Sequence, residues 1–524
     1  MTKSRCISGC KGLETEFCEK APRCSYANGE KRKFCRLRRT FKMNKYDCSV
    51  RKKTNKNQKV LTIQKFIQET APKRRSEFLK AICSDSGFCY AIGNNRKKIF
   101  DFFNGFVNFE FVKPPIVSIG NPSANGFVKS VKYERLGYSA NAVLKSSSKQ
   151  TADNLAYEFL VGMFLNQMGD RFPCFVQTYG LYYYLSDYKW EHARNTNHIT
   201  TNIMKDSLQL HTKWSKYKNN INYVLDEDVC SNSKYAAILI QHFSNIKTFD
   251  DVLTSSINQP DKWCKFTLNE LPSILYQTYM PLAVMSKEFT HYDLHHNNIL
   301  LYEPAPGKYI QYHYHHGNET VTFKSKYIVK IIDYGRAFYK NSEINRVSST
   351  DVLKSVCVLD DCNIQGEECG NKSGFKFLSN TLTPSEYFMS SSEHNPSADL
   401  RFIYILKRLY RKRHFKDILG LGHCGEPDLE YEAFDPINDI LNLVSYGIGL
   451  NPGQTKYGTK PIKQSGLPTV ISNVSDVEKM LRMALTTNYM LRTFNDTAYE
   501  NMTKVCDIHI YSDGTTNMKI FTAK

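Results

Sequence analysis

Apolar residues recur along this chain with two periods, one typical of helices and the other of strands. Between residues 60 and 112 they return at i, i+3 and i+4, which predicts a helical collar with one face turned to a core. Beyond it, short strand-like runs alternate with longer segments of helical period, an order that predicts an α+β fold. The predicted strands are Ala142–Lys145, Phe175–Tyr184, Tyr235–Ile240, Ile299–Leu301 and Ile328–Ile332, and the predicted helices are Ala152–Met168 and Leu268–Lys287.

The last quarter of the chain carries three further signals. A helix is expected to begin near Asp399. Ser475 and Glu478 have the spacing of a capping box, and they precede apolar positions on one helical face: Val477, Met480, Leu481 and Ala484. Asp513-Gly514 lies between two strand-like runs, so residues 501–524 are predicted to form a C-terminal hairpin.

Composition indicates a large globular chain. Its 524 residues, 41% of them hydrophobic, allow two to four domains with sizeable cores. No apolar run reaches the roughly 18 residues that a membrane span needs. Sixteen cysteines without a leading apolar segment favour reduced thiols in a cytosolic compartment. We therefore expect a soluble protein.

The net charge of +19 is concentrated at the N-terminus. Residues 1–59 hold 18 Lys and Arg against 5 Asp and Glu, a local net charge of +13. Such a segment suits contact with the phosphates of nucleic acid or of an acidic membrane surface. A solvated arm without a partner is an equally good interpretation.

The same segment contains six cysteines, and so many thiols in so short a stretch suggest a small module stabilised by zinc, because 59 residues cannot build a sufficient core unaided. No C-x-x-C pair is present, which leaves a basic tail with free thiols as the alternative. The cysteines are Cys6, Cys10, Cys18, Cys24, Cys35 and Cys48.

Two stretches in the second half of the chain carry the chemistry. In Thr290–Leu301, His291, Asp293 and Asn298 have the H-x-D-L-x-x-x-N spacing of a kinase catalytic loop, and Asp333-Tyr334-Gly335 has the place of D-F-G. Phosphoryl transfer needs one carboxylate facing the acceptor hydroxyl, and oxygen ligands that hold Mg²⁺ against the phosphates. Asp293 is therefore the candidate base, and Asn298 and Asp333 are the candidate metal ligands.

Nucleotide-binding candidates lie upstream in the order that this chemistry requires. The stretch from Ile119 to Val128 resembles a glycine-rich phosphate loop, although its middle glycine is absent and it is one residue longer. Lys145 ends an A-V-L-K strand that resembles V-A-I-K, and we expect it to pair with Glu158 of the next helix. Residues 241–244 are predicted to be a linker that meets the adenine through backbone groups. The cofactor-binding candidates are Gly120, Asn121, Ser123, Gly126, Val128, Lys145, Gln241 and Phe243.

With these motifs the chain resembles the eukaryotic-type serine/threonine kinases of nucleocytoplasmic large DNA viruses, of the mimivirus, iridovirus and asfarvirus kind. The stretches Ser76–Gly93 and Lys460–Pro468 are also similar to that group. The resemblance implies a bilobal kinase fold, with the N-lobe at residues 113–244 and the C-lobe, with insertions, at 245–500. It further implies ATP and Mg²⁺ or Mn²⁺ as cofactors, protein serine and threonine hydroxyls as acceptors, and a location in the virion or the infected-cell cytoplasm.

Three features keep alternatives open. Tyr292 replaces the arginine that reads an activation-loop phosphate in many kinases, and His295 replaces the usual lysine two residues after the catalytic aspartate. The D-L-H sequence also resembles haspin-like kinases and aminoglycoside or choline phosphotransferases, so a small-molecule acceptor and a non-catalytic binding protein remain alternatives. His313, His315 and His316 suit either a metal or an aromatic hairpin, and the insertion between the last two N-lobe strands has no assignable function.

Overall fold

The computed structural model describes most of residues 92–340 and parts of the remaining chain. The described residues are 24–28, 33–37, 92, 95–106, 109–123, 126–147, 155–210, 235–243, 246–257, 259–340, 375–378, 386–389, 394–412, 437, 439–441, 471 and 473–522. They fall into two compact units, Met1–Pro72 and Lys73–Lys524. Within these ranges, no helix is long and apolar enough to cross a bilayer.

The first unit contains one described hairpin. Its strands are antiparallel, with Cys24 opposite Leu37 and Asn28 opposite Lys33. Four of the six cysteines predicted to hold zinc lie outside the described residues, so that prediction stays open. The two strands are β1 (Cys24–Asn28) and β2 (Lys33–Leu37).

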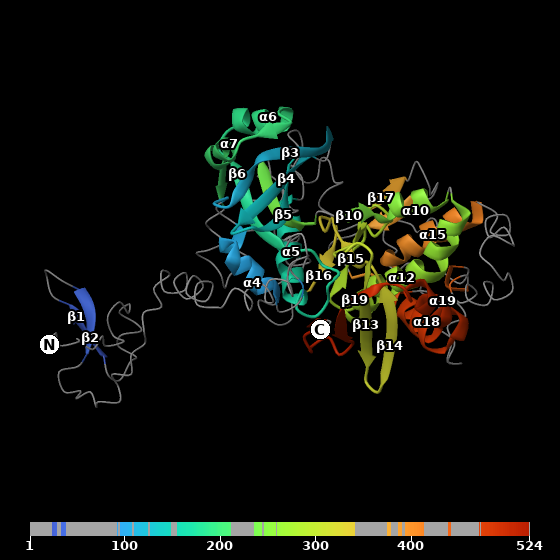
Figure 1. Cartoon of the computed structure of the whole chain (residues 1–524). Coiled ribbons are helices and arrows are strands. Elements are labelled where there is room, and N and C mark those ends of the chain that lie inside the picture. The colour runs from blue at the N-terminus through green and yellow to red at the C-terminus, as the bar shows by residue number, and fades with distance from the viewer. Residues whose placement is uncertain are drawn as a thin grey trace. The chain divides into compact units, whose positions relative to one another are not determined.

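The second unit contains a seven-stranded antiparallel sheet (Figure 1). The strand order is β7-β3-β4-β5-β9-β6-β8, and the insertion between β6 and β9 supplies both edge strands. Part of the predicted insertion therefore completes the sheet on each side. The strands are β3 (Val112–Ser123), β4 (Gly126–Arg135), β5 (Tyr138–Ser146), β6 (Thr178–Tyr184), β7 (His198–Ile199), β8 (Leu208–Leu210) and β9 (Ala236–His242).

Helices flank this sheet, and the end of the predicted collar packs into its core. Phe106 stacks on Tyr179 with ring centroids 4.3 Å apart, and Tyr133 donates its hydroxyl to Phe106 O at 2.7 Å. In α5, Gly162 allows close contact with β6, because a Cβ there would lie 2.1 Å from Thr178 Oγ1. The helices are α4 (Asn95–Phe102), the 3₁₀ turn η2 (Asn104–Phe106), α5 (Leu155–Met168), α6 (Asp187–Asn195) and α7 (Thr201–Ser207).

Helices and short strands form the following part of the unit. The predicted helix at 268–287 is present, but its first turn is a π-helix, and its α-helical part ends at Val284. The elements are β10 (Ile246–Thr248), α10 (Phe249–Ile257), α11 (Pro260–Lys265), η3 (Phe266–Glu270), α12 (Leu271–Val284), β11 (Phe289–Thr290), β12 (Ile299–Tyr302), β15 (Ile328–Ile331), β16 (Phe338–Tyr339), β17 (Phe375–Leu378), β18 (Glu386–Met389), η4 (Ala398–Leu400) and α15 (Arg401–Lys412).

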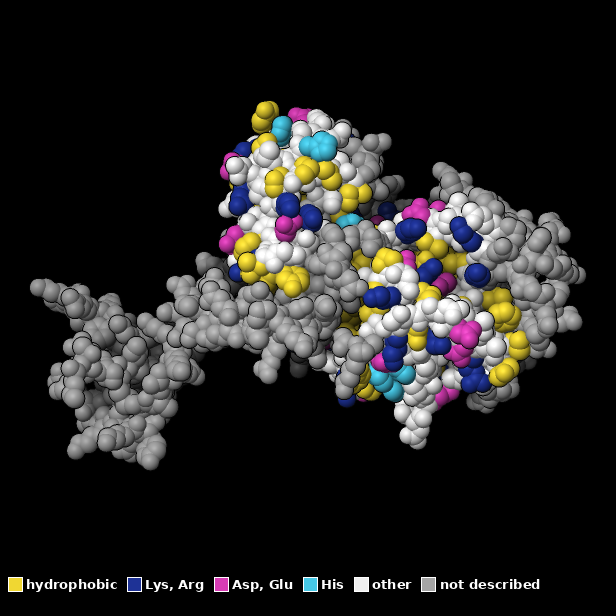
Figure 2. All heavy atoms as spheres, in the orientation of Figure 1, with side chains coloured by type: hydrophobic (Ala, Val, Ile, Leu, Met, Phe, Trp, Pro, Cys, Tyr) yellow, Lys and Arg dark blue, Asp and Glu magenta, His cyan; other side chains and the backbone are white. Residues whose placement is uncertain are grey.

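A second sheet joins the middle of the chain to its C-terminus. The predicted C-terminal hairpin is present, and its first strand also pairs in parallel with β13, so that Tyr312 lies opposite Ile508. Figure 2 shows histidine side chains gathered near these strands, where His313 and His509 stack with centroids 4.4 Å apart. Among the described residues, no group of three or more His, Cys, Asp or Glu side chains suits a metal ion. The strands are β13 (Lys308–His316), β14 (Glu319–Ser325), β19 (Thr503–Tyr511) and β20 (Lys519–Thr522).

Two helices cover this second sheet, and the start of the first corrects a prediction. The N-cap of α18 is Asn473 rather than Ser475, because the Asn473 side chain accepts from the backbone N–H of Ser475 and Asp476, and Asp476 accepts from the N–H of Asn473. The predicted apolar face is nevertheless buried. The helices are α18 (Val474–Thr487) and α19 (Tyr489–Ala498).

Candidate functional site

Lys145 lies at the centre of a group of charges from three parts of the chain. Its Nζ donates to Glu158 Oε2 at 2.7 Å, so the ion pair predicted between β5 and α5 is present. The same Nζ donates to Asp333 Oδ1 at 2.9 Å. A lysine of the seven-stranded sheet is thus joined to the loop that follows β15.

The two carboxylates differ in exposure. The Glu158 side chain is 2% exposed, and burial raises its pKa while Lys145 acts against that rise. The Asp333 side chain is 45% exposed, and Lys145 is the main cause of its pKa being lowered to about 2. Burial opposes the charge on Lys145, yet Asp333 and Glu158 raise its pKa above the ordinary value. At neutral pH the site therefore presents an ionised, open carboxylate beside a fixed cation.

Asn298 is bonded through its backbone to the residue that precedes Asp333. Ile332 N donates to Asn298 O at 3.1 Å, and β12 pairs with β15 so that Ile299 lies opposite Ile331. Asn298 Nδ2 donates to Asp293 O at 2.9 Å, a hydrogen bond that does not use the amide oxygen Oδ1. A carboxylate and an amide oxygen on neighbouring loops are hard donors of the kind that Mg²⁺ prefers, so Asn298 and Asp333 fit the predicted metal.

Asp293 is largely buried and bonded to an arginine that the sequence did not single out. Arg401 Nη1, from the first turn of α15, donates to Asp293 Oδ1, and the two side chains are 10% and 14% exposed. His295 Nε2 lies 3.7 Å from the same oxygen. Burial lowers the pKa of His295 to about 4, so the cation beside Asp293 at neutral pH is Arg401. Burial opposes the charge on Asp293, but Arg401 is the first of several groups that lower its pKa below the ordinary value.

The Asp399 side chain fixes the backbone of the loop that carries Asp293. Its carboxylate accepts the backbone N–H of His291 and of Tyr292, each at 2.8 Å. Asp399 is 2% exposed, and burial raises its pKa to about 6. Tyr292 has a φ of 64°, a left-handed conformation that non-glycine residues rarely adopt. The two hydrogen bonds stabilise this bend, which presents Asp293 next in the chain.

The tyrosine of Asp333-Tyr334-Gly335 is fixed inside the core. Its hydroxyl donates to Ile331 O at 2.5 Å and accepts from Val176 N at 3.2 Å. Its ring lies 5.9 Å from that of His291, whose Nε2 is 2.9 Å from Ile332 O. A tyrosine thus finds hydrogen-bond partners here that a phenylalanine could not use.

The predicted phosphate loop coincides with the turn between β3 and β4. Its tip, residues 124–125, and the side chains of Gly120, Asn121 and Ser123 lie outside what the structure describes. Gly126 has a φ of 105°, and a Cβ there would lie 2.0 Å from Ser146 O, so this position requires glycine. Val128 pairs with Lys145 across β4 and β5, which places it next to the charged group.

The predicted linker begins later than expected. Gln241 and His242 belong to β9, because they pair with Ala142 and Asn141 of β5. The backbone N–H of Gln241 is bonded to Gln177 O at 2.8 Å, so this N–H is not available to a ligand. The Phe243 side chain is buried against Tyr302, with centroids 4.3 Å apart, so this side chain is not available to a ligand.

The structure thus brings Lys145, Glu158 and Asp333 together, and joins Asp293 to Asn298. It adds Asp399 and Arg401, which sequence reasoning missed. The only available signal was their position at the start of the predicted helix, two residues apart.

Comparison with known proteins gives one partial match. No family model matches the chain. A probable serine/threonine-protein kinase of Dictyostelium discoideum is 32% identical over 130 residues, which cover 23% of this chain and 11% of that protein. The match indicates kinase-like character at most.

Proposed function

We propose that this protein is an ATP-dependent serine/threonine protein kinase, with the two lobes of the kinase fold at residues 113–244 and 245–500. The observation that carries the proposal is the bridge from Lys145 to both Glu158 and Asp333. A lysine that grips phosphates, its helical glutamate and a metal-binding aspartate are the parts that must be in place together for phosphoryl transfer.

The residues would divide the work as follows. Lys145 would hold the phosphates, with Glu158 orienting its ammonium group. Asp333 and Asn298 would hold Mg²⁺ or Mn²⁺, whose charge stabilises the phosphates during transfer. Asp293 would orient the acceptor hydroxyl through Oδ2, since Oδ1 is bonded to Arg401.

Arg401 supports transfer without the usual lysine. A guanidinium carries five donors in a rigid fork, more than its bond to Asp293 uses. We infer that it supplies the positive charge that His295 cannot provide when neutral. Because Tyr292 replaces the phosphate-reading arginine, we do not expect activity to require phosphorylation of the segment after Gly335.

The acceptor is proposed to be a protein hydroxyl. A kinase for a small metabolite must enclose its acceptor. A peptide needs only an open groove beside Asp293. After the catalytic loop, the acidic residues Asp360, Asp361, Glu367 and Glu368 belong to a long cysteine-bearing segment that suits a surface loop better than a pocket for a cationic metabolite. The resemblance to kinases of large DNA viruses leads us to propose action in the virion or the infected-cell cytoplasm.

The test is transfer from labelled ATP with Mg²⁺ to casein and myelin basic protein. Wild-type protein should give phosphoserine or phosphothreonine, whereas Lys145→Met, Asp293→Asn and Asp333→Asn should each remove transfer without lowering the melting temperature by more than a few degrees. Lys205→Met and Asp206→Asn, exposed positions on α7, are the matched controls and should keep full activity.

Two outcomes would overturn the proposal. If no protein is labelled, the enzyme itself included, but ATP is consumed with an aminoglycoside, choline or a sugar, the protein is a small-molecule phosphotransferase. If ATP is consumed under none of these conditions, it is a non-catalytic binding protein.

A further inference from the structure

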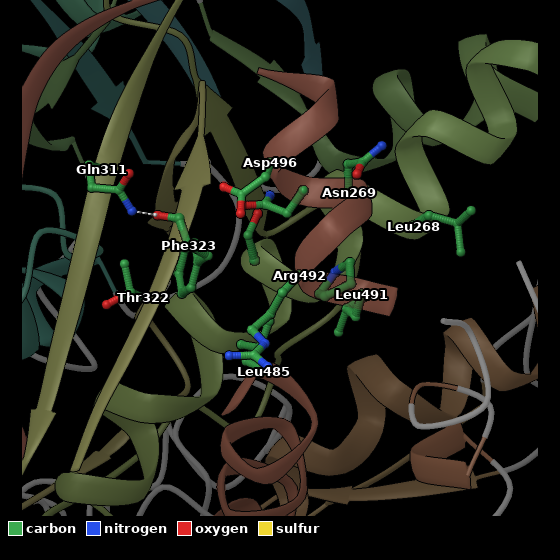
Figure 3. A pocket seen from close by; sticks show the side chains of 12 residues that line it. Leu268, Asn269, Gln311, Thr322, Phe323, Leu485, Leu491, Arg492 and Asp496 are labelled. Carbon is green, nitrogen blue, oxygen red and sulfur yellow. Dashed lines mark hydrogen bonds between the residues drawn. The ribbon is translucent and has the colours of Figure 1, made fainter. Parts of the chain in front are cut away.

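Two neighbouring cavities lie beside the π-helical turn η3, away from the charges around Lys145. The smaller, of about 260 Å³, lies between η3, the β13–β14 hairpin and α19. Figure 3 shows Gln311, Thr322 and Phe323 on one side of it and Leu268 and Asn269 on the other. The larger, of about 900 Å³, is lined by α10, α11, η3 and α19. Leu268 and Asn269 line both cavities, so the two are neighbours, and the larger one is called the groove below.

Asn269 carries an acceptor without a donor. The residue is 7% exposed, and its Oδ1 is fully buried without a hydrogen-bond partner among the described residues. A buried amide oxygen in this condition is destabilising, so its retention needs an explanation. It lies within a π-helical turn, a local distortion often found at functional sites. An N–H donor from outside would satisfy this oxygen once the amide turns toward the groove.

The larger cavity adds positive charge to apolar walls. Lys326 lies 3.9 Å from Glu270, which balances it. Lys247, Lys262 and Lys265 are exposed, and no ion pair joins them to another described residue. On the face shown in Figure 2, Lys and Arg side chains lie among apolar ones around α10 and α12. The apolar lining is Val252, Phe266, Leu268, Phe494, Ala498 and Met502.

We propose that this groove docks an extended acidic segment of a protein partner. The Asn269 amide would turn on binding, so that its Oδ1 accepts from a main-chain N–H of the segment. Apolar side chains of the segment would pack on residues such as Phe266, and its carboxylates would face the three lysines. A volume near 900 Å³ is at the upper end of the range for ligand pockets and suits a short peptide. That the partner is a substrate of the site at Asp293 rests on the proposed function.

An acidic peptide fits better than a nucleic acid. Nucleic-acid interfaces are strongly positive and polar. Here Glu270 and Glu303 share the cavity with the lysines, and much of the wall is apolar. The amide acceptor at Asn269 also matches a peptide N–H, which every residue except proline supplies.

Hydrogen exchange of the full-length protein, with and without a copolymer of glutamate and tyrosine, tests the proposal without ATP. In the wild type, binding should slow exchange of residues 260–271. The slowing should be lost in Lys262→Glu/Lys265→Glu and reduced in Asn269→Leu. The Asn269→Leu variant should melt no lower than wild type, because it removes an acceptor that has no partner. Lys97→Glu/Lys205→Glu and Asn202→Leu, at exposed positions outside the groove, should behave as wild type.

A second measurement joins the groove to catalysis. The two groove variants should raise the KM for casein at least fivefold and leave the KM for ATP unchanged. Equal protection of residues 260–271 in wild type and both groove variants would overturn the proposal. So would protection by single-stranded DNA that is stronger than protection by the copolymer and is lost in the same variants. A wild type that transfers no phosphate would end the proposed function, while the exchange experiment would still decide whether the groove binds acidic segments.

Discussion

Replacing Arg401 separates the candidate base from the cation that faces it. The Arg401 guanidinium is 10% exposed and bonded to Asp293 Oδ1, whose side chain is 14% exposed. Arg401→Met keeps the aliphatic stem and removes the charge. Arg401→Lys keeps the charge but loses the planar fork.

The size of the effect follows from burial. Breaking a buried ion pair by removing one partner costs about 3–5 kcal/mol, because it leaves a charge without compensation. Asp293 retains some solvent, so we expect the lower end, about 3 kcal/mol, in Arg401→Met. In a chain of 524 residues that corresponds to a fall in melting temperature of about 3 °C. The loss of charge beside the transferring phosphoryl group should lower kcat about a hundredfold, as removing one stabilising donor does in other enzymes.

The pH dependence gives a sharper test than the rate alone. Arg401 lowers the pKa of Asp293, so the stability from this pair is present above the ordinary carboxyl pKa and is lost as pH falls through the lowered value. In Arg401→Met the acid limb of kcat should move to higher pH, and Arg401→Lys should move it back part of the way. Measurement of kcat from pH 4.5 to 8, with thermal melting at each pH, tests both.

The matched control is Arg482→Met. Arg482 bonds Glu319 at 2.7 Å and also Glu478 at 3.1 Å, whose side chain is 12% exposed, so Arg482→Met likewise removes the cation beside a largely buried carboxylate and should also lower the melting temperature. It should leave kcat and its acid limb unchanged. If Arg401→Met kept kcat within threefold of wild type with the same acid limb, Arg401 would have no part in the reaction and the reasoning from burial would be wrong.

Three further predictions follow from other contacts. Tyr334→Phe should lower the melting temperature by about 1–3 °C in calorimetry while kcat is kept, because the acceptor for the buried Val176 N–H and the donor to Ile331 O are both lost, at about 1–3 kcal/mol; an unchanged melting temperature would contradict this. Asp399→Ala should speed hydrogen exchange in residues 290–298 and reduce kcat, because it leaves two backbone N–H groups of the loop without their acceptor; unchanged exchange there would show that the loop holds its bend unaided. Deletion of residues 1–59, with their net charge of +13, should weaken heparin binding and flatten its salt dependence while transfer to a small test substrate persists, and equal affinity with and without the segment would refute an electrostatic role.

Local pattern predicted the elements around the site because each motif is short and continuous. Lys145 and Glu158 lie 13 residues apart on an adjacent strand and helix, and the likeness of A-V-L-K to the kinase motif V-A-I-K predicted their contact. The α+β composition, the C-terminal hairpin and the buried face of α18 were also predicted from local periods. The start of α18 was missed because asparagine caps as well as serine does, and two candidate caps stood two residues apart.

The pairing of strands that lie far apart in the chain could not be predicted from local sequence patterns. β13 and β19 are about 190 residues apart and pair in parallel, a contact that no turn signal announces. The insertion after β6 looked featureless, yet its short strands β7 and β8 close the two edges of the seven-stranded sheet. Edge strands need few residues and little hydrophobic pattern, so their sequences carry a weak signal.

The same limit explains why Arg401 was missed and why it matters to the proposal. Its partner Asp293 is 108 residues earlier, and the two meet only because Asp399 bonds the backbone of His291 and Tyr292. One turn of chain thus both shapes the loop and brings a cation to its carboxylate. A sequence that has histidine in place of the usual lysine can keep a positive charge beside Asp293 in this way, because the fold, rather than the motif, determines which residues are neighbours. Substitutions within a short motif are therefore weak grounds for inferring loss of activity until the residues that pack against that motif are known.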